Sequence, residues 1–426
     1  MICIKLLIEL LFKNNEVNKI VRNSFFTQHC FSLPNSANLD RLIGLRQFKR
    51  ILQKLWIEKI NVVDSILSCN STNQSFLYVL FPEYISEKLN YLEGRDKIKG
   101  AFSKKNLLLE LNFFSKVSFT ILNFIFFPFI FFHTFFFKKN RINIALFTEH
   151  IIQCCVLIEK LNTVNCKKLY FFFTHEPEAN LLAHFLMQQG VNIVKIPNSN
   201  PLFMFNKELI ASTVVLTLGY QIEEAKYFYK NYKELKFEFW QPQMLDKFYN
   251  IEFKNQYQNK LCYYSHASWL RFKEDHHLPW FSEVRAEINL LNKIKANDFL
   301  SQYEITVCLH PKEKKSIENF NEAKKYYEGI FGDNVILSQT SSYDSFNKFE
   351  IGFGAFSTIL FERLHCGHKT ILMIEDVQGF PLSNSNFNYL TAKQFSDFEE
   401  KIKKAMHNDV DDFFENCTNY TYRLER

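Results

Sequence analysis

The amino-acid sequence predicts an α/β fold built from two Rossmann-like βαβ domains. Short runs of apolar, β-branched residues alternate with longer amphipathic segments, and this alternation is typical of parallel sheets covered by helices. The pattern occurs twice, over about 141–232 and about 260–376. A chain of 426 residues is also longer than one ordinary hydrophobic core can organise, which favours two domains.

The second array shows the clearer pattern. A long charged helix is expected over 283–297, between the first two strands of this array. In parallel sheets, ligands bind at the carboxyl ends of the strands, where the next helix begins. The strands of this array are predicted over 259–265, 304–309, 334–339, 350–354 and 369–376.

The first array is preceded by a long stretch with weaker signals. Residues 1–12 are apolar without a basic start or a cleavage site, so we expect a strand or helix of the first domain. Residues 23–105 are polar and helix-prone, and they carry no recognisable chemistry. The strands of the first array are predicted over 141–147, 167–173, 191–196 and 212–219.

The domain boundaries follow from a break between the two arrays. A stretch rich in aromatic and amide residues interrupts the βαβ pattern and predicts an interdomain linker at 246–259. The predicted organisation is therefore an N-terminal domain over 1–245, a second domain over 260–390, and C-terminal helices over 391–426.

Composition excludes several classes of protein. A hydrophobic content of 47% excludes a disordered chain, and a net charge of +6 is too mild to indicate a nucleic-acid partner. None of the ten cysteines forms a CxxC pair, so a zinc ribbon or thioredoxin-like site is not expected. Cys262 and Cys308 fall inside strand patterns and are predicted to be buried thiols of a reduced, cytosolic protein.

The most hydrophobic stretch of the chain lies at 117–137 and is rich in Phe. Its 21 residues are just enough to span a bilayer, but Asn123, Pro128 and His133 interrupt it. Basic residues flank it on both sides, which does not favour a single span. The sequence therefore predicts a membrane-associating segment lying in the interface of an anionic leaflet, with a true span or a buried helix as alternatives.

Ser357 and Thr358 stand where a predicted strand passes into a helix. Free N–H groups at a helix N-terminus favour anions such as the phosphate of a sugar nucleotide, and the alternative is that Ser357 only caps the helix. Gly352 and Gly354 in the preceding strand predict close approach of a ligand or another backbone. Glu362, one turn after Thr358, can accept hydrogen bonds from ribose hydroxyls or remain a solvated charge.

His310 and Pro311 end the second strand of this array. Pro311 stops sheet pairing and fixes the turn. An imidazolium at His310 can neutralise a leaving phosphate or donate a proton to it, and the alternative is a structural histidine. Lys312, Lys314 and Lys315 raise the local positive potential.

The first array carries two pairs of an acid and a histidine at predicted strand ends. The pairs are Glu149 with His150, and His175 with Glu176. Either pair can supply a general base, and the alternative is loop polarity with helix N-capping.

A strand ending in His-Pro, followed two βα units later by Ser-Thr at a helix start, resembles the bacterial sialyltransferases and polysialyltransferases. More broadly, the chain is similar to the GT-B glycosyltransferases of capsule and lipopolysaccharide assembly. The resemblance covers about 260–376. It implies two domains that face one another across a cleft, and it implies that His310, Ser357 and Thr358 contact the phosphate of a CMP-activated donor.

The chain departs from this family in its first half. The sialyltransferases hold their catalytic base in an acidic-acidic-Gly motif, and neither Glu223-Glu224 nor Glu149-His150 reproduces it. The base and the donor sugar therefore stay open. No Asp-x-Asp occurs in a strand-end loop, which agrees with metal-independent chemistry.

The resemblance implies a glycosyltransferase on the cytoplasmic face of the bacterial inner membrane, attached as a peripheral or monotopic protein. A nucleotide sugar, with CMP-sialic acid and CMP-Kdo as candidate donors, would meet His310, Pro311, Ser357, Thr358, Glu362 and the turn from Ser265 to Ser268. The first domain would supply the acceptor face and the base, with Glu149 or His150 as candidates. The acceptor would be a surface glycan or glycolipid, and neither a metal nor another cofactor is expected.

Two other functions remain open from the sequence. A polyol-phosphate transferase of the CDP-glycerol type would use a similar His and Ser/Thr pattern, with His150 or His175 as its second histidine. The other alternative is a membrane-associated scaffold that keeps a degenerate GT-B fold without activity.

Overall fold

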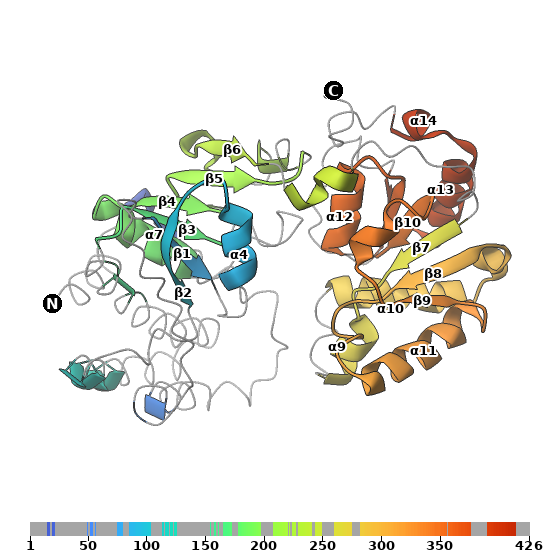
Figure 1. The fold of residues 1–426 in the computed structure, drawn as a ribbon, viewed down its shortest axis with the longest axis horizontal. Coiled ribbons are helices and arrows are strands. Elements are labelled where there is room, and N and C mark those ends of the chain that lie inside the picture. Colours follow the sequence, from blue (N-terminus) through green and yellow to red (C-terminus); the bar gives the residue numbers. More distant parts are fainter. Residues whose placement is uncertain are drawn as a thin grey trace. The chain divides into compact units, whose positions relative to one another are not determined.

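The structure, a computed structural model, forms two compact units (Figure 1). The first comprises Met1–Asn198, Met204–Leu216 and Tyr229–Glu238, and the second comprises Ser199–Phe203, Thr217–Phe228 and Phe239–Arg426. The structure describes 75–79, 85–103, 165–172, 178–196, 208–219, 229–240, 243–248, 260–274, 282–355, 357–375 and 390–414, with single positions and short groups before residue 165 and between 221 and 226.

A six-stranded sheet organises the first unit, in the order β2-β1-β3-β4-β5-β6, and its pairs from β2 to β5 are parallel. Helices α4 (Ile85–Leu92) and α7 (Glu178–Gln188) follow β1 and β3 along the chain. The predicted strand over 141–147 lies outside the described residues. The strands are β1 (Ser75–Val79), β2 (Ile98–Ser103), β3 (Lys168–Phe171), β4 (Asn192–Lys195), β5 (Thr213–Leu216) and β6 (Phe237–Phe239).

Strands β1 and β2 correct the expectation that residues 23–105 are helical. All five residues of β1 are buried, and the strand pairs with β2 on one side and with β3 on the other. A five-residue strand buried on both faces has neither an alternating pattern nor a helical one, so a polar neighbourhood conceals it.

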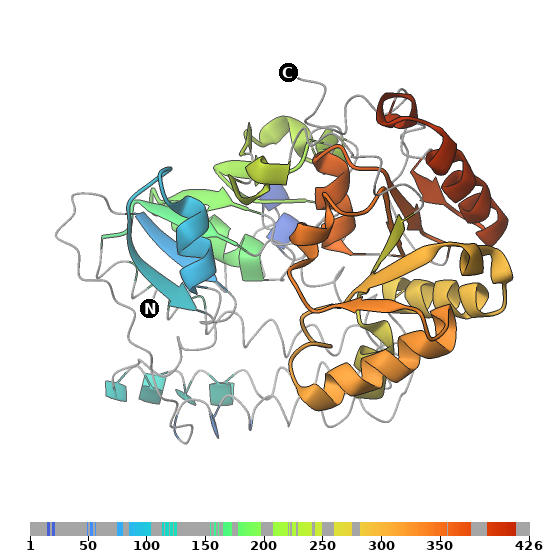
Figure 2. The ribbon, with the colours of Figure 1, turned by 45° about the vertical axis from the view of Figure 1, so that its right-hand side comes forward.

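The second unit contains a parallel sheet in the order β12-β11-β10-β7-β8-β9, flanked by helices (Figures 1 and 2). The predicted α/β class is thus confirmed, with parallel sheets in both units, and each strand predicted in the second array is present. The arrangement of two domains about a cleft stays a prediction. The strands are β7 (Lys260–Tyr264), β8 (Glu304–Cys308), β9 (Ile336–Ser338), β10 (Ile351–Gly354), β11 (Thr370–Met373) and β12 (Thr391–Ala392). The helices are α9 (Ser268–Glu274), α10 (Ser282–Lys295), α11 (Ile317–Phe331), α12 (Thr358–His365), α13 (Phe395–His407) and α14 (Val410–Phe414).

The strand order of the second sheet is that of a dinucleotide-binding fold. The chain runs outward from β7 through β8 to β9, returns across β7, and continues outward in the other direction from β10 to β12. Counted along the chain, this is the order 3-2-1-4-5-6. Because the direction reverses between β7 and β10, the crevice at their carboxyl ends is the position where such sheets bind ligands.

Alternate residues of β7 face opposite sides of the sheet, as the period of a strand requires. Leu261 and Tyr263 join a core cluster with side chains of α10, α11 and α13. Cys262 and Tyr264 join the other cluster, with side chains of α12 and α14. Cys262 and Cys308 are free, buried thiols whose sulfur atoms lie 3.3 Å apart, which confirms the prediction for both.

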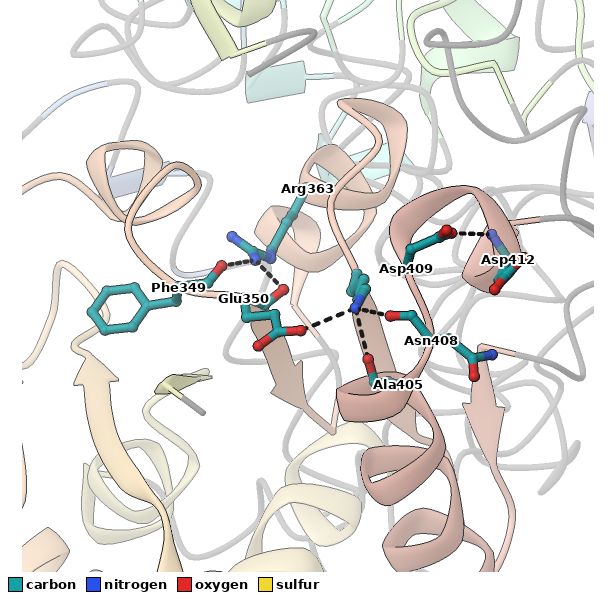
Figure 3. Close-up of polar contacts among 8 residues, drawn as sticks. Phe349, Glu350, Arg363, Ala405, Asn408, Asp409 and Asp412 are labelled. Atoms are coloured by element: carbon teal, nitrogen blue, oxygen red, sulfur yellow. Dashed lines mark hydrogen bonds and ion pairs between the residues drawn. The ribbon is translucent and has the colours of Figure 1, made fainter. Parts of the chain in front are cut away.

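Gly352 makes room for a buried arginine, not for a ligand. Arg363 of α12 is fully buried and donates to the backbone carbonyl of Phe346. It also donates to the carbonyls of Phe349 and Glu350 (Figure 3). A Cβ at Gly352 would lie 2.6 Å from the Nε atom of Arg363. The close approach predicted at this glycine is therefore made by the chain's own side chain.

A buried lysine ties the start of β10 to the end of α13. Lys369 is 3% exposed, and its Nζ atom lies 3.0 Å from a carboxylate oxygen of Glu350. It also donates to the backbone carbonyls of Ala405 and Asn408, which lie beside Glu350 in Figure 3. A lysine ammonium at the C-terminal carbonyls of a helix satisfies groups that the helix itself leaves unpaired.

Two histidines at the end of α12 attach returning segments of the chain to the second unit. The Gly219 N–H donates to Nδ1 of His365 at 3.1 Å, and Nε2 of His368 lies 2.9 Å from the Phe248 carbonyl. Both histidines are buried. These contacts explain why residues 217–228 and the short helix Gln243–Phe248 belong to this unit.

Within the described residues, no helix is long and apolar enough to cross a membrane. Only part of the predicted segment 117–137 lies among them, in short groups up to residue 125.

Gly352→Ala is expected to destabilise the protein by about 1–3 kcal/mol, because the added methyl group must displace the Arg363 guanidinium. Gly329→Ala, inside α11, is the matched control, since a Cβ at Gly329 would meet no atom within 4 Å. This substitution should stabilise the protein by about 0.5–1 kcal/mol, because alanine favours the helix more than glycine does. Urea unfolding measures both changes. Equal stability of Gly352→Ala and the wild type would contradict this account of the buried arginine.

His365 should make stability depend on pH. Burial lowers its pKa to about 4, below the ordinary value of about 6.5, so the unfolded chain binds more protons between these values. Stability is therefore lost as pH falls below about 6.5, by about 1.4 kcal/mol per pH unit.

Urea unfolding at pH 7 and pH 5.5 tests this dependence. The His365→Asn variant retains an acceptor for the Gly219 N–H and should lose less stability than the wild type over this interval. His407→Asn, at an exposed position, should lose as much as the wild type. Identical pH dependence of all three proteins would show that His365 does not titrate as described.

Candidate functional site

The turn between β7 and α9 is held by a buried carboxylate. Glu287 of α10 is 1% exposed and accepts hydrogen bonds from the backbone N–H groups of His266 at 2.6 Å and Ser268 at 2.8 Å. It also accepts from the Tyr263 hydroxyl. Ala267 has a φ of 58°, a left-handed conformation that costs energy for a residue with a side chain. Glu287 therefore fixes a strained turn at the point where the sheet reverses direction.

The two serines of this turn are buried and engaged within the protein. The Ala267 N–H donates to the Ser265 hydroxyl at 2.8 Å, and the Tyr327 hydroxyl lies 2.7 Å from the same oxygen. The Ser268 hydroxyl lies 3.4 Å from Nδ1 of His266. The structure thus places both predicted donor-binding serines at the switch point, where their side chains order the turn.

A second buried carboxylate holds the turn after β8. Glu313 is fully buried and accepts from the His310 N–H at 2.7 Å. It also accepts from the Trp269 indole N–H at 2.6 Å and from the Tyr327 hydroxyl at 2.8 Å. Burial raises the pKa of Glu313, and the nearby Glu287 raises it further. Pro311 lies inside this turn, which the Glu313 N–H closes by donating to the His310 carbonyl.

His310 lies against the guanidinium of Arg271. Nη2 of Arg271 is 3.3 Å from Nε2 of His310, while Nε of Arg271 donates to the His266 carbonyl at 2.9 Å and so anchors the side chain. Burial and the charge of Arg271 lower the pKa of His310 to about 3. At neutral pH the ring is therefore uncharged in this arrangement.

Either tautomer of His310 leaves one ring N–H pointing at another donor. A neutral imidazole carries a single N–H, and here Nδ1 lies 3.1 Å from the Lys312 backbone N–H while Nε2 faces Arg271. An anionic oxygen beside Nε2 would accept from both the ring and the guanidinium. The arrangement is thus suited to receive an anion.

Ser357 and Thr358 lie at the start of α12, as the sequence predicts. Ser357 is the N-cap residue, but its side chain makes no capping hydrogen bond. Its carbonyl accepts from the Leu360 N–H at 3.1 Å, and the residue is 9% exposed. Glu362, one turn further on, accepts from the Tyr343 hydroxyl at 3.0 Å.

The sheet sets the order of these groups along one edge. Ser357 follows β10, the turn with Ser265 follows β7, and His310 follows β8, which are three adjacent parallel strands. Strands lie about 4.8 Å apart, so the β8 and β10 ends are separated by about 10 Å. The predicted second-domain residues therefore gather at one sheet edge, on both sides of the switch point.

The predicted first-domain bases, Glu149 and His150, lie outside the described residues, as does His175. Among the described residues, Glu224 is a buried carboxyl for which both oxygens lack a hydrogen-bond partner. Burial raises its pKa to about 7, which suits a group that accepts a proton near neutral pH. The sequence offered only the pair Glu223-Glu224, without the expected motif.

Sequence reasoning missed Arg271, Glu287 and Glu313 as members of this site. Arg271 lies on a short helix, and Glu287 lies in a charged helix whose polar residues resemble a solvated face. Glu313 stands among lysines just after His310. Only the folded sheet shows that these two carboxylates are buried.

No protein-family model matches the chain, and no curated protein matches it. Several solved structures resemble it weakly. The three described next have TM-scores below 0.5, so no functional argument is based on them.

Three of these structures illustrate the likeness. A UDP-GlcNAc 2-epimerase of Methanocaldococcus jannaschii, solved with UDP-GlcNAc and UDP, is 11% identical with a TM-score of 0.42, over 79% of this chain and 93% of that one. A glycosyltransferase of Rickettsia africae is 12% identical with a TM-score of 0.39, over 83% and 96%. The wall teichoic acid polymerase TagF is 9% identical with a TM-score of 0.35, over 89% and 91%.

Glu313→Gln is expected to cost about 2 kcal/mol of stability, because the amide's NH₂ group must face donors that now point at a carboxylate. Glu322→Gln is the control, since Glu322 pairs with Lys273 at the surface and should contribute less than about 1 kcal/mol. Urea unfolding measures both effects. If Glu313→Gln were as stable as the control, the carboxylate would not be holding the His310 turn.

Proposed function

We propose that this protein is a transferase that binds a nucleotide-activated sugar at the carboxyl edge of its second sheet. The observation that carries the proposal is the contact between Nη2 of Arg271 and Nε2 of His310, 3.3 Å apart beside the switch point. Sheets with this strand order bind nucleotides at this position.

Arg271 and His310 have the chemistry to hold the leaving phosphate. The guanidinium and the ring N–H can both donate to one phosphate oxygen, and such charge-assisted hydrogen bonds are among the stronger ones in proteins. A bound phosphate also raises the pKa of His310, because its negative charge opposes the effect of Arg271. The ring then becomes a better proton donor to the departing nucleotide at neutral pH.

The start of α12 supplies a second set of contacts in the proposed site. The N-terminal N–H groups of this helix carry partial positive charge, and the hydroxyls of Ser357 and Thr358 lie beside them. Glu362, positioned by Tyr343, is suited to accept hydrogen bonds from ribose hydroxyls. A donor lying from α12 to His310 would cross the switch point.

The proposed reaction breaks the bond between the anomeric carbon and a phosphate oxygen, which keeps the electron pair. The acceptor hydroxyl forms the new bond to that carbon and gives its proton to a base. Glu149 and His150 remain the predicted bases of the first domain. Arg271 and His310 stabilise the charge that develops on the phosphate, so the proposal includes no metal ion.

The resemblance to sialyltransferases makes CMP-sialic acid and CMP-Kdo the first donors to examine, with a surface glycan or glycolipid as acceptor. A CDP-glycerol-type donor would present a phosphate to the same groups. Thermal-shift measurements with CMP, CDP, UDP and GDP distinguish these donors. A nucleotide at one hundred times its dissociation constant stabilises the protein by about 2.7 kcal/mol.

His310→Ala and Arg271→Ala should each weaken nucleotide binding by about tenfold or more, since each removes a charge-assisted hydrogen bond of about 1.5–3 kcal/mol. Transfer of the sugar should fall by at least the same factor while the fold is retained. Lys273→Ala, on the same helix and paired with Glu322 at the surface, should bind like the wild type. Calorimetric titration measures the affinities.

Two outcomes would overturn the proposal. Stabilisation by none of the nucleotides would favour the scaffold that the sequence left open. Full transfer activity of a purified His310→Ala variant would remove the phosphate role assigned to this histidine.

A further inference from the structure

The described residues between 113 and 125 are helical and include the most exposed large apolar side chains among the described residues of the first unit. Phe114 is 82% exposed and Phe113 is 66% exposed, and three further side chains of this stretch are 55–58% exposed. These three are Ile121, Phe124 and Ile125. Figure 2 draws the helical pieces of this stretch in teal.

The exposed apolar side chains of this stretch gather on one face of the helix. At about 100° per residue, the five exposed apolar side chains fall within an arc of about 120°. The described polar residues Lys116, Thr120 and Asn123 fall outside this arc, where Asn123 is fully buried and the other two are half-buried. A helix of a soluble protein normally turns its apolar stripe to the core.

This orientation is fixed by contacts with another part of the first unit. The Trp56 indole N–H donates to the Thr120 hydroxyl at 2.8 Å, and that hydroxyl donates to the Lys116 carbonyl at 2.7 Å. The Trp56 ring also meets the Phe113 ring edge-on, with centroids 6.0 Å apart. Trp56 is therefore bound to one edge of the exposed apolar face, and the rest of that face stays exposed.

We infer that this face is a membrane-docking surface that inserts its apolar side chains into an anionic lipid leaflet. The charge of the flanking sequence is complementary to such a leaflet, because 104–141 contains six Lys or Arg residues and one acid, Glu110. An apolar helical face with basic residues beside it is the combination that binds lipid interfaces. The surface lies in the first unit, and the inference does not depend on the proposed transfer reaction.

The apolar face begins before the predicted segment 117–137, since Phe113 and Phe114 belong to it. The inference is therefore more specific than the segment expected from the sequence, because it names the side chains of one face that would enter the membrane. Anionic lipid is the partner that the basic flanks favour, and a second copy of the chain is the alternative that the experiment must separate.

Co-sedimentation with vesicles tests the inference on the full chain. The wild type should bind vesicles of phosphatidylcholine with 30% phosphatidylglycerol more tightly than vesicles of phosphatidylcholine alone, and added salt should weaken the binding. The triple variant Phe114→Ser, Ile121→Ser, Phe124→Ser should bind these vesicles at least about tenfold more weakly than the wild type. The control Ile317→Ser, Ile336→Ser, at exposed positions of the second unit, should bind like the wild type.

A second measurement keeps the test independent of how the triple variant folds. Phe114→Trp retains an aromatic ring at the most exposed position, and its emission should shift to shorter wavelength when anionic vesicles are added. An unchanged emission, or equal vesicle binding by the triple variant and the wild type, would overturn the inference. Dimerisation through this face would also overturn the inference. Light scattering would then give the mass of a dimer for the wild type and of a monomer for the triple variant.

Discussion

The candidate site depends on two carboxylates that are buried beneath it. Glu287 and Glu313 accept hydrogen bonds from backbone N–H groups at the ends of β7 and β8. Glu287 comes from α10, whereas Glu313 belongs to the turn after β8. Burying a carboxylate is costly unless hydrogen bonds compensate, and here each accepts three. The two carboxylates thus make both turns rigid. The groups left facing outward are the cationic guanidinium of Arg271 and the neutral ring of His310.

The sequence predicted those parts of the fold that follow from local pattern. The strands of the second array were identified from apolar runs, and His310 and Ser357 were found because strand ends in a parallel sheet share one edge. Strand β1 was missed because a short strand buried on both faces gives no period to detect. The order of the strands was not predictable, since each pairing joins segments far apart in the chain.

The residues of the site that sequence reasoning missed have one property in common. Arg271, Glu287 and Glu313 act through partners on other elements, so their role appears only when those elements meet. Gly352 shows the same limitation in another way. Its close approach was predictable from the missing side chain, but the partner proved to be Arg363, which comes from the following helix and fills the space beside the strand.

The attachment of segments 217–228 and 243–248 to the second unit has a consequence for dissecting the molecule. Leu218, Leu245 and Phe248 are part of the same core cluster as Cys262 and Tyr264. A fragment that began at β7 would expose the apolar surface these three side chains cover, and His365 and His368 would lose their backbone partners. The unit that carries the candidate site is therefore built from separate segments of the sequence. No single cut in the chain would release it whole.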